Sequence, residues 1–158
     1  MDLEAKKKAL RMITYGLYVL TAKRGDQVNG ATVTWLSQAS FEPPLVMVGL
    51  RRDSLIHDMV EESGAFAVNV LGEGQEDVAE TFFRTAKVEG DRISGFSFES
   101  GETGAPLLLD APAFFECRVV EVVKRGDHTV FVGEVIAAGV RREAEPLVLA
   151  DTPWTYGG

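Results

Sequence analysis

The sequence predicts a mainly β protein, a single antiparallel barrel that carries a few short helices. About six apolar segments of strand length are separated by turn residues, which is typical of strands joined by hairpins. Only three segments have helical spacing, and each is short. The turn string Lys-Arg-Gly-Asp occurs twice, from Lys23 and from Lys124, as two hairpin turns of one type would require. Because no linker divides the chain, we expect residues 1–158 to form one domain.

The expected strands are rich in aromatic and β-branched residues and are bounded by turn-forming residues. They cover residues 15–23, 28–40, 45–50, 65–71, 113–124 and 129–142. Between the fourth and fifth of these strands, residues 85–106 are rich in glycine and in charged side chains. We therefore expect residues 85–106 to form a loop.

The first expected helix covers residues 2–12, with Asp2 as its N-cap. Its apolar residues at helical spacing are Leu3, Leu10 and Ile13. The third expected helix covers residues 74–84. Its inward-facing side chains are expected to be Val78, Ala79, Phe82 and Phe83. The second helix begins at Asp53 or Ser54 and ends at Ser63, before Gly64, a residue that suits a helix C-terminus.

The junction between the strand at residues 45–50 and the second helix carries the strongest functional signal. Arg51 and Arg52 stand there beside the hydroxyl of Ser54. A helix N-terminus offers unpaired backbone N–H groups and the positive end of the helix dipole, so this junction is suited to a phosphate group. The same residues have a local explanation, because Asp53 and Ser54 cap helices anyway and surface arginines are common. Spacing alone leaves both interpretations open.

The strand before this junction suits a flat ligand. Thr32 and Thr34 alternate there with Val33 and Trp35, so hydroxyls and bulky apolar groups are expected on opposite faces. A flat, partly polar ligand with a phosphate tail would match such a surface.

Arg84 and Lys87, which follow Phe82 and Phe83, form a second basic corner. Cations are favoured at a helix C-terminus for local reasons. This corner therefore supports phosphate binding only if it lies close in space to the corner at Arg51 and Arg52. The nearby string from Gly72 to Asp77 has the setting of a dinucleotide fingerprint, but it lacks the third glycine. Its three carboxylates would repel a pyrophosphate, and we reject a Rossmann site.

Composition excludes several classes of function. The net charge of −8 argues against nucleic acid and against anionic membrane surfaces as partners. Cys117 is the only cysteine, so we expect no disulfide and a buried apolar role for this side chain. No apolar run reaches the ~18 residues of a membrane span, and no signal peptide opens the chain, so the cytoplasm is the expected location.

The two histidines, His57 and His128, lie far apart and have no cysteine partner, so we expect no metal site. His128 is either a turn residue bonded to Asp127 or a catalytic group. Trp154 and Tyr156 close the chain beside glycines. These aromatic rings either cap the barrel or cover a flat ligand, in the same chain or in a partner chain.

Several strings, taken in order, resemble the flavin reductase-like proteins with an FMN-binding split barrel. They are Tyr-Gly-Leu-Tyr from Tyr15, the run at residues 29–44, Glu-Ser-Gly-Ala-Phe from Glu62, Val-Asn-Val-Leu from Val68, Phe-Phe-Arg from Phe82 and the segment at residues 126–135. The likeness covers nearly the whole chain. Within that family, the chain is most similar to the ferric reductase and flavoredoxin-like branch and to the reductase modules of diflavin proteins.

The resemblance implies a six-stranded antiparallel split barrel of the Greek-key type, dimeric, with FMN near the subunit interface. It implies that Thr32 to Trp35, including Val33 and Thr34, line the isoalloxazine. The residues implied at the phosphate and at the ring edge are Leu50, Arg51, Arg52, Ser54, Phe83, Arg84, Thr85 and Lys87, with Trp154 as part of the cover. His128 would lie where the nicotinamide of NADH or NADPH docks.

Two positions depart from the family pattern. Ile56 replaces a threonine that commonly contacts the phosphate, and Leu149 replaces a tyrosine of the tail. The implied function is an FMN-dependent oxidoreductase that takes electrons from NAD(P)H and passes them to a flavin, a ferric complex or a protein acceptor. The alternatives are an FMN-binding electron carrier that is reduced by a protein donor and lacks nicotinamide activity, and a non-catalytic flavin-storage module.

Overall fold

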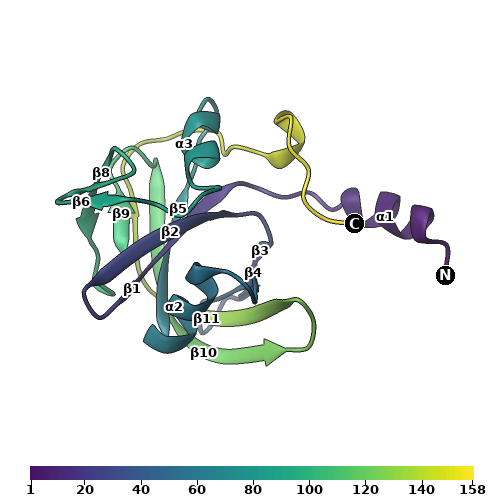
Figure 1. Cartoon of the computed structure of the whole chain (residues 1–158), viewed down its shortest axis with the longest axis horizontal. Helices are drawn as coiled ribbons and strands as arrows, with labels where there is room; N and C mark the ends of the chain where they lie inside the picture. Colours follow the sequence, from purple (N-terminus) through teal and green to yellow (C-terminus); the bar gives the residue numbers. More distant parts are fainter.

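A computed structural model describes all residues from 1 to 158 (Figure 1). Its strands are β1 (Tyr18–Arg24), β2 (Gln27–Val33), β3 (Leu36–Ser40), β4 (Leu45–Arg51), β5 (Ala65–Val70), β6 (Val88–Glu89), β7 (Arg92–Ile93), β8 (Phe96–Ser100), β9 (Pro106–Leu108), β10 (Ala113–Lys124) and β11 (His128–Val140). Its helices are α1 (Leu3–Arg11), α2 (Leu55–Ser63), α3 (Glu76–Thr81) and the short 3-10 helix η1 (Leu149–Asp151). No helix is long and apolar enough to cross a membrane.

The predicted antiparallel split barrel is confirmed. Seven strands form one antiparallel sheet in the order β2-β1-β5-β10-β11-β4-β3. β2 and β3 are consecutive in the chain, yet they lie at opposite edges of this sheet. Only Thr34 and Trp35 separate these two strands, so the sheet must curl until its edges approach each other.

The expected single strand at residues 28–40 is wrong, because Thr34 and Trp35 belong to neither β2 nor β3. The Leu36 amide donates to the Thr34 carbonyl at 3.0 Å, a tight local bond that a continuous strand cannot make. The Trp35 carbonyl instead accepts from the amide of Gly49 at 2.9 Å. Counted as one bent element, β2 and β3 restore the six strands that were predicted.

The barrel interior is a cluster of twelve buried, mainly aliphatic side chains, and α2 fills one end of it. Phe66 and Phe131 from the wall and Met59 from α2 are fully buried. Cys117 is buried in the same cluster, as predicted, and burial raises the pKa of its thiol to about 12. The thiol therefore stays protonated and serves as a small apolar group.

The expected loop at residues 85–106 is wrong, because β6, β7, β8 and β9 form a second, four-stranded sheet within residues 88–108. Its strands are short, so their alternation is too brief to recognise in the sequence. Ile93 and Leu108 of this sheet pack with Val78 and Phe82 in a second core of eleven residues. The carboxylate of Glu116 accepts two backbone amides and the Thr103 hydroxyl, and so holds the turn between β8 and β9.

The predicted caps of α1 and α2 are confirmed, while the predicted extent of α3 and the predicted burial of Phe83 are wrong. Ser54 caps α2, and Gly64 ends it with a left-handed φ of 71°. α3 is shorter than expected, and Phe83, predicted to be in the core, is 50% exposed because it follows the end of that helix. Asp2 caps α1 as predicted, but no residue of α1 is buried.

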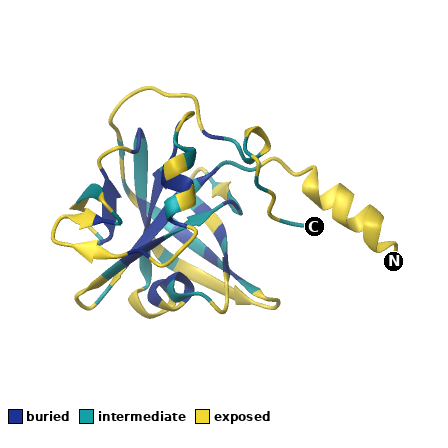
Figure 2. Ribbon diagram, turned by 45° about the horizontal axis from the view of Figure 1, so that its top comes forward, coloured by how far each residue is buried: buried dark blue, intermediate teal, exposed yellow.

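α1 projects from the barrel, with its surface exposed all round (Figures 1 and 2). The chain returns at its C-terminus to lie beside this helix. There the Lys6 ammonium donates to the Gly158 carbonyl at 2.7 Å, and the Arg11 Nε donates to the Gly157 carbonyl at 3.0 Å. The last two residues of the chain are thus bonded to α1.

Replacing Gly133 with alanine should destabilise the barrel. A Cβ at this position would lie 2.7 Å from the Cys117 Cβ and 2.8 Å from the Phe66 Cζ, both inside the core. Overpacking of this kind costs about 1–3 kcal/mol, which thermal unfolding would report as a fall in Tm of about 2–12 °C. Gly126→Ala is the matched control, since no atom lies within 4 Å of its Cβ. Equal melting temperatures for the two variants would contradict this packing.

Candidate functional site

A cavity of about 460 Å³ opens where the β2–β3 link, the start of α2, the end of α3 and the C-terminal segment meet. Its size falls within the range of roughly 300–1,000 Å³ that is usual for small-molecule and cofactor sites. The predicted site residues that line it are Thr32, Val33, Thr34, Trp35, Arg51, Ser54, Phe83 and Trp154. Arg51 and Ser54 of the first basic corner therefore share one cavity with Phe83, which precedes the second corner, although they are remote in sequence.

Other predicted site residues lie elsewhere. The Leu50 side chain is 2% exposed and belongs to the barrel core. Arg84, Thr85 and Lys87 are exposed and follow Phe83 outside the cavity lining. Arg52 and His128 line a second, polar hollow of about 420 Å³ next to the cavity.

The cavity also has walls that were not predicted as site residues. They are Leu17, Ala31, Gly49, Ile56, Phe82, Leu149, Thr155 and Tyr156. Ile56 and Leu149 stood out only as departures from the family pattern, and Tyr156 only as an aromatic residue of the tail. Leu17, Ala31 and Phe82 lie in strings that carry the family resemblance, but nothing in those strings marks them individually as cavity residues. Apolar and small residues acquire a place in a cavity only through the fold.

The β2–β3 link leaves two polar atoms without a partner. The Thr32 hydroxyl donates to the Ala79 carbonyl at 2.6 Å and so joins the end of β2 to α3. The Thr34 Oγ1 and the Trp35 Nε1, by contrast, are buried and have no hydrogen-bond partner. Hydroxyls and apolar side chains were expected on opposite faces of a strand from Thr32 to Trp35, and this expectation is wrong. β2 ends at Val33, and all four residues from Thr32 to Trp35 line the cavity. Buried polar atoms without partners are rare in proteins, and a bound ligand is one way to satisfy them.

The arginine corner already has internal partners. The Arg51 guanidinium makes two bonds to the Asp53 carboxylate, at 3.1 Å and 3.0 Å, and the Asp53 hydrogen bond raises the pKa of Arg51. The Ser54 hydroxyl accepts from the His57 amide at 3.2 Å and donates to the Arg51 carbonyl at 2.7 Å. The local explanation as a helix cap is therefore correct for Ser54 alone, since the Asp53 carboxylate binds Arg51 instead, and an anion here would share Arg51 with that carboxylate.

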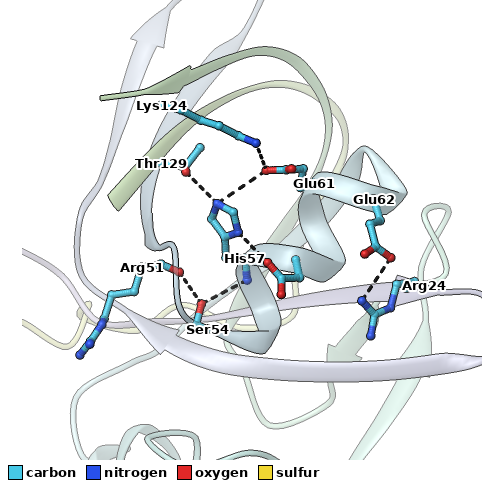
Figure 3. A network of polar contacts seen from close by, with 9 residues as sticks. Arg24, Arg51, Ser54, His57, Glu61, Glu62, Lys124 and Thr129 are labelled. Carbon is cyan, nitrogen blue, oxygen red and sulfur yellow. Dashed lines mark hydrogen bonds and ion pairs between the residues drawn. The ribbon is translucent and has the colours of Figure 1, made fainter. Parts of the chain in front are cut away.

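A buried histidine fixes the start of α2 against the barrel wall (Figure 3). His57 is 5% exposed, and its Nε2 lies 2.7 Å from the Thr129 Oγ1 of β11. One turn further along α2, the Lys124 ammonium lies 2.6 Å from the Glu61 carboxylate and lowers the pKa of Glu61. These bonds tie both turns of α2 to the β10–β11 hairpin and so hold the arginine corner in place.

His128 lies against the cavity wall. Its ring is 4.4 Å from the Trp35 ring, its Nδ1 is 2.8 Å from the Asp127 carboxylate and its Nε2 is 2.6 Å from the Tyr156 hydroxyl. The hydrogen bond to His128 lowers the pKa of Asp127. The strand register places His128 directly opposite Arg51, since β11 pairs with β4. Trp35 and Tyr156 line the cavity and His128 does not, so His128 stands behind them.

Together these features suit one kind of ligand. Trp35, Phe83 and Trp154 give the cavity broad aromatic walls, and Thr34 and Trp35 supply free polar atoms. Arg51 and the N-terminus of α2 place positive charge at one edge. A flat heteroaromatic group with an anionic tail matches this arrangement.

Comparisons with known proteins agree with this description. The flavin reductase like domain family matches residues 10–155. A ferric-chelate reductase (NAD(P)H) from Archaeoglobus fulgidus is 36% identical over 96% of this chain and 88% of its own length. The styrene monooxygenase flavin reductase from Pseudomonas putida, a solved structure, is 31% identical, with a TM-score of 0.77 over 94% of this chain and 91% of that one.

Other relatives are longer than this chain. A high molecular weight rubredoxin from Moorella thermoacetica is 32% identical over 90% of this chain, which spans 63% of it. A diflavin flavoprotein from Nostoc is 36% identical over 81% of this chain, which spans 23% of it. The same domain therefore occurs both as most of a protein and as part of a larger one.

Two Thr→Val substitutions should differ in their effect on the free energy of unfolding. Thr129→Val removes the partner of a buried histidine nitrogen, which should cost about 1–3 kcal/mol. Thr34→Val removes a buried hydroxyl that has no partner, so the ligand-free protein should lose nothing or gain stability. Urea unfolding of both variants measures the difference. A loss for Thr34→Val as large as that for Thr129→Val would show that the Thr34 hydroxyl is bonded after all.

Proposed function

Because this chain belongs to the flavin reductase-like domain family, we propose that it is an oxidoreductase that takes electrons from NADH or NADPH and passes them through FMN to a second acceptor. The acceptor is a flavin, a ferric complex or a protein. The observation that carries the proposal is the pair of unpartnered polar atoms, on Thr34 and Trp35, in an aromatic cavity with a cationic edge. A bound flavin supplies the redox chemistry, and this chain supplies the binding surface and the exclusion of water.

The cavity supports FMN in preference to FAD. Positive charge from Arg51 and the start of α2 gathers at one edge, which suits a single phosphate. Within the cavity lining, Arg51 is the only charged residue, so a second phosphate and an adenosine have no comparable cradle there. Thr34 and Trp35 would hold the ring, while Phe83 and Trp154 would cover it.

An electron carrier without nicotinamide activity is the second candidate. Two observations favour it. His128, the residue expected to meet the nicotinamide, does not line the cavity in this structure. Relatives such as the Nostoc diflavin flavoprotein carry this domain as a small part of a longer chain, in which electrons could come from another domain.

A visible spectrum of the purified protein, followed by anaerobic addition of NADH and then NADPH, separates these candidates. We expect a flavin spectrum, with or without added FMN, that bleaches with at least one nucleotide. A flavin that only dithionite bleaches would identify the carrier. A colourless protein that rejects added FMN would exclude both functions.

Arg51→Ala should weaken FMN binding by about 10- to 100-fold, since a charge-assisted hydrogen bond contributes ~1.5–3 kcal/mol. Riboflavin, which lacks the phosphate, should lose little affinity. Asp53→Asn removes the carboxylate that shares Arg51 and should tighten FMN binding by a few-fold. Arg52→Ala is the control, because Arg52 lies outside the cavity. Titration of the flavin absorbance measures all of these. Equal losses for FMN and riboflavin would mean that Arg51 supports the fold and not the phosphate.

We also propose that the protein is a homodimer in which α1 packs on the partner subunit. The chain exposes 8861 Å², against roughly 7,800 Å² expected for a monomer of 17.2 kDa. Leu3, Met12 and Ile13 are 70%, 83% and 52% exposed on and beside α1. The helix and its cap carry four basic and two acidic side chains, a net charge of +2. The rest of the chain has a net charge of −10, which is opposite in sign and so favours contact with this helix.

Light scattering should therefore give twice the mass of one 17.2 kDa chain at micromolar concentration. Met12→Glu with Ile13→Glu should shift the mass toward one chain, because both side chains would enter an apolar interface with charge. A wild-type mass of one chain, with flavin bound, would contradict the dimer.

A further inference from the structure

The C-terminal segment from Pro153 to Gly158 passes over the cavity with few bonds to hold it. After Thr152, no backbone group of the segment is hydrogen-bonded to another backbone group. Its attachments are the Trp154 amide to the Thr152 hydroxyl, the two carbonyls held by α1, and the bond from Tyr156 to His128. Side-chain packing adds to these bonds, since the Trp154 ring lies 4.8 Å from the Phe83 ring and packs on the second core. Beyond Trp154 the segment has no backbone bonds and few apolar contacts, so its end can open at lower cost in free energy than the barrel.

The Tyr156 hydroxyl bonds to the ring nitrogen of His128 that Asp127 does not contact. The Asp127 carboxylate can only accept a hydrogen bond when ionised, so it fixes the proton of neutral His128 on Nδ1. Nε2 is then an acceptor, and the Tyr156 hydroxyl donates to it at 2.6 Å. Burial raises the pKa of the Tyr156 phenol, so the hydroxyl remains a donor at neutral pH.

Tyr156 also stands between His128 and the cavity. It lines both the cavity and the polar hollow that contains His128, and its ring meets the Trp35 ring edge-on at 5.1 Å. A molecule in the cavity cannot reach His128 Nε2 while the hydroxyl remains in place. Displacement of this one side chain would bring the cavity and the hollow into contact.

We propose that Tyr156 is a latch on the C-terminal segment, which occupies His128 in the closed state and must release it for the nicotinamide nucleotide to dock. This rests on the function proposed above and names the residue that regulates access to that site. The Tyr156 hydroxyl affects nucleotide binding only through its bond to His128. The hydroxyl competes with the nucleotide for one nitrogen, so the latch weakens nucleotide binding.

Tyr156→Phe tests the latch, because it keeps the ring and loses only the hydroxyl. A hydrogen bond contributes about 0.5–1.5 kcal/mol, so the FMN-loaded variant should bind the nucleotide about 2- to 10-fold more tightly than wild type. Two measurements report this: titration of the flavin absorbance with NAD⁺ and NADP⁺, and the NADH or NADPH concentration at half-maximal anaerobic reduction. Tyr15→Phe is the matched control, since Tyr15 also lies near Trp35, at 6.4 Å, with no bond to His128.

The double variant shows whether the hydroxyl acts through His128. In a His128→Ala background, Tyr156→Phe should change nucleotide affinity by less than about 1.5-fold. The same tightening in both backgrounds would overturn the latch, as would unchanged or weaker binding in the single variant. Weaker binding would instead make Tyr156 a support for the cavity wall.

A measurement on the ligand-free protein keeps the latch separate from the proposed function. The ¹⁵N order parameters of Gly157 and Gly158 should fall in Tyr156→Phe and stay unchanged in Tyr15→Phe. If neither nucleotide reduces the wild-type protein, the proposed function is wrong. The role of the latch in nucleotide docking falls with that function, while a fall in those order parameters still shows that Tyr156 restrains the C-terminal segment. Unchanged order parameters in Tyr156→Phe would overturn this restraint, and with it the latch.

Discussion

The whole arrangement depends on the closure of one sheet by a link of two residues. β2 and β3 are the edge strands, and an edge strand presents unpaired backbone groups that must be covered or paired. With only Thr34 and Trp35 between them, these edges cannot lie far apart. The two link residues leave both ladders, so their side chains face neither the barrel core nor open solvent. That position makes them the floor of the cavity.

Polar bonding is divided between the framework and the cavity. On the framework side, the His57 ring, the Thr129 hydroxyl, the Thr32 hydroxyl and the Glu116 carboxylate all have partners. On the cavity side, the link leaves two buried polar atoms without any. This contrast separates structural polar groups from those available to a ligand. It supports the cavity, and not the buried histidine, as the proposed ligand site.

The charged groups around the cavity are held by near neighbours. Arg51 binds Asp53, two residues away, and His128 binds Asp127, the adjacent residue. The Arg51–Asp53 pair is exposed, as is the Asp127 side of the second pair, and ion pairs of this kind contribute little to stability, so their members can exchange partners at low cost. A phosphate at Arg51 and a nucleotide at His128 would each replace an existing contact. Such exchange of partners suits the function proposed above, in which ligands bind and leave.

The sequence by itself determined the features that depend on neighbouring residues. Five of the six predicted strands, the caps at Asp2, Ser54 and Gly64, and the hairpin turns follow from local spacing and backbone preference, and the structure confirms them. The resemblance to a family added the split barrel and half of the residues that line the cavity. The break at Thr34 escaped prediction because β2 and β3 lie on opposite edges, which no local pattern records.

Only the tertiary structure decided which side chains meet. Arg51 and His128 are opposite each other because β4 pairs with β11, and Tyr156 reaches His128 because the tail crosses the cavity toward α1. Arg51 lines both the cavity and the polar hollow, whereas Arg52, next to it in sequence, lines only the hollow. Strand pairing and the path of the tail join residues that are far apart in the chain. Local sequence fixes backbone conformation, whereas long-range packing fixes contact.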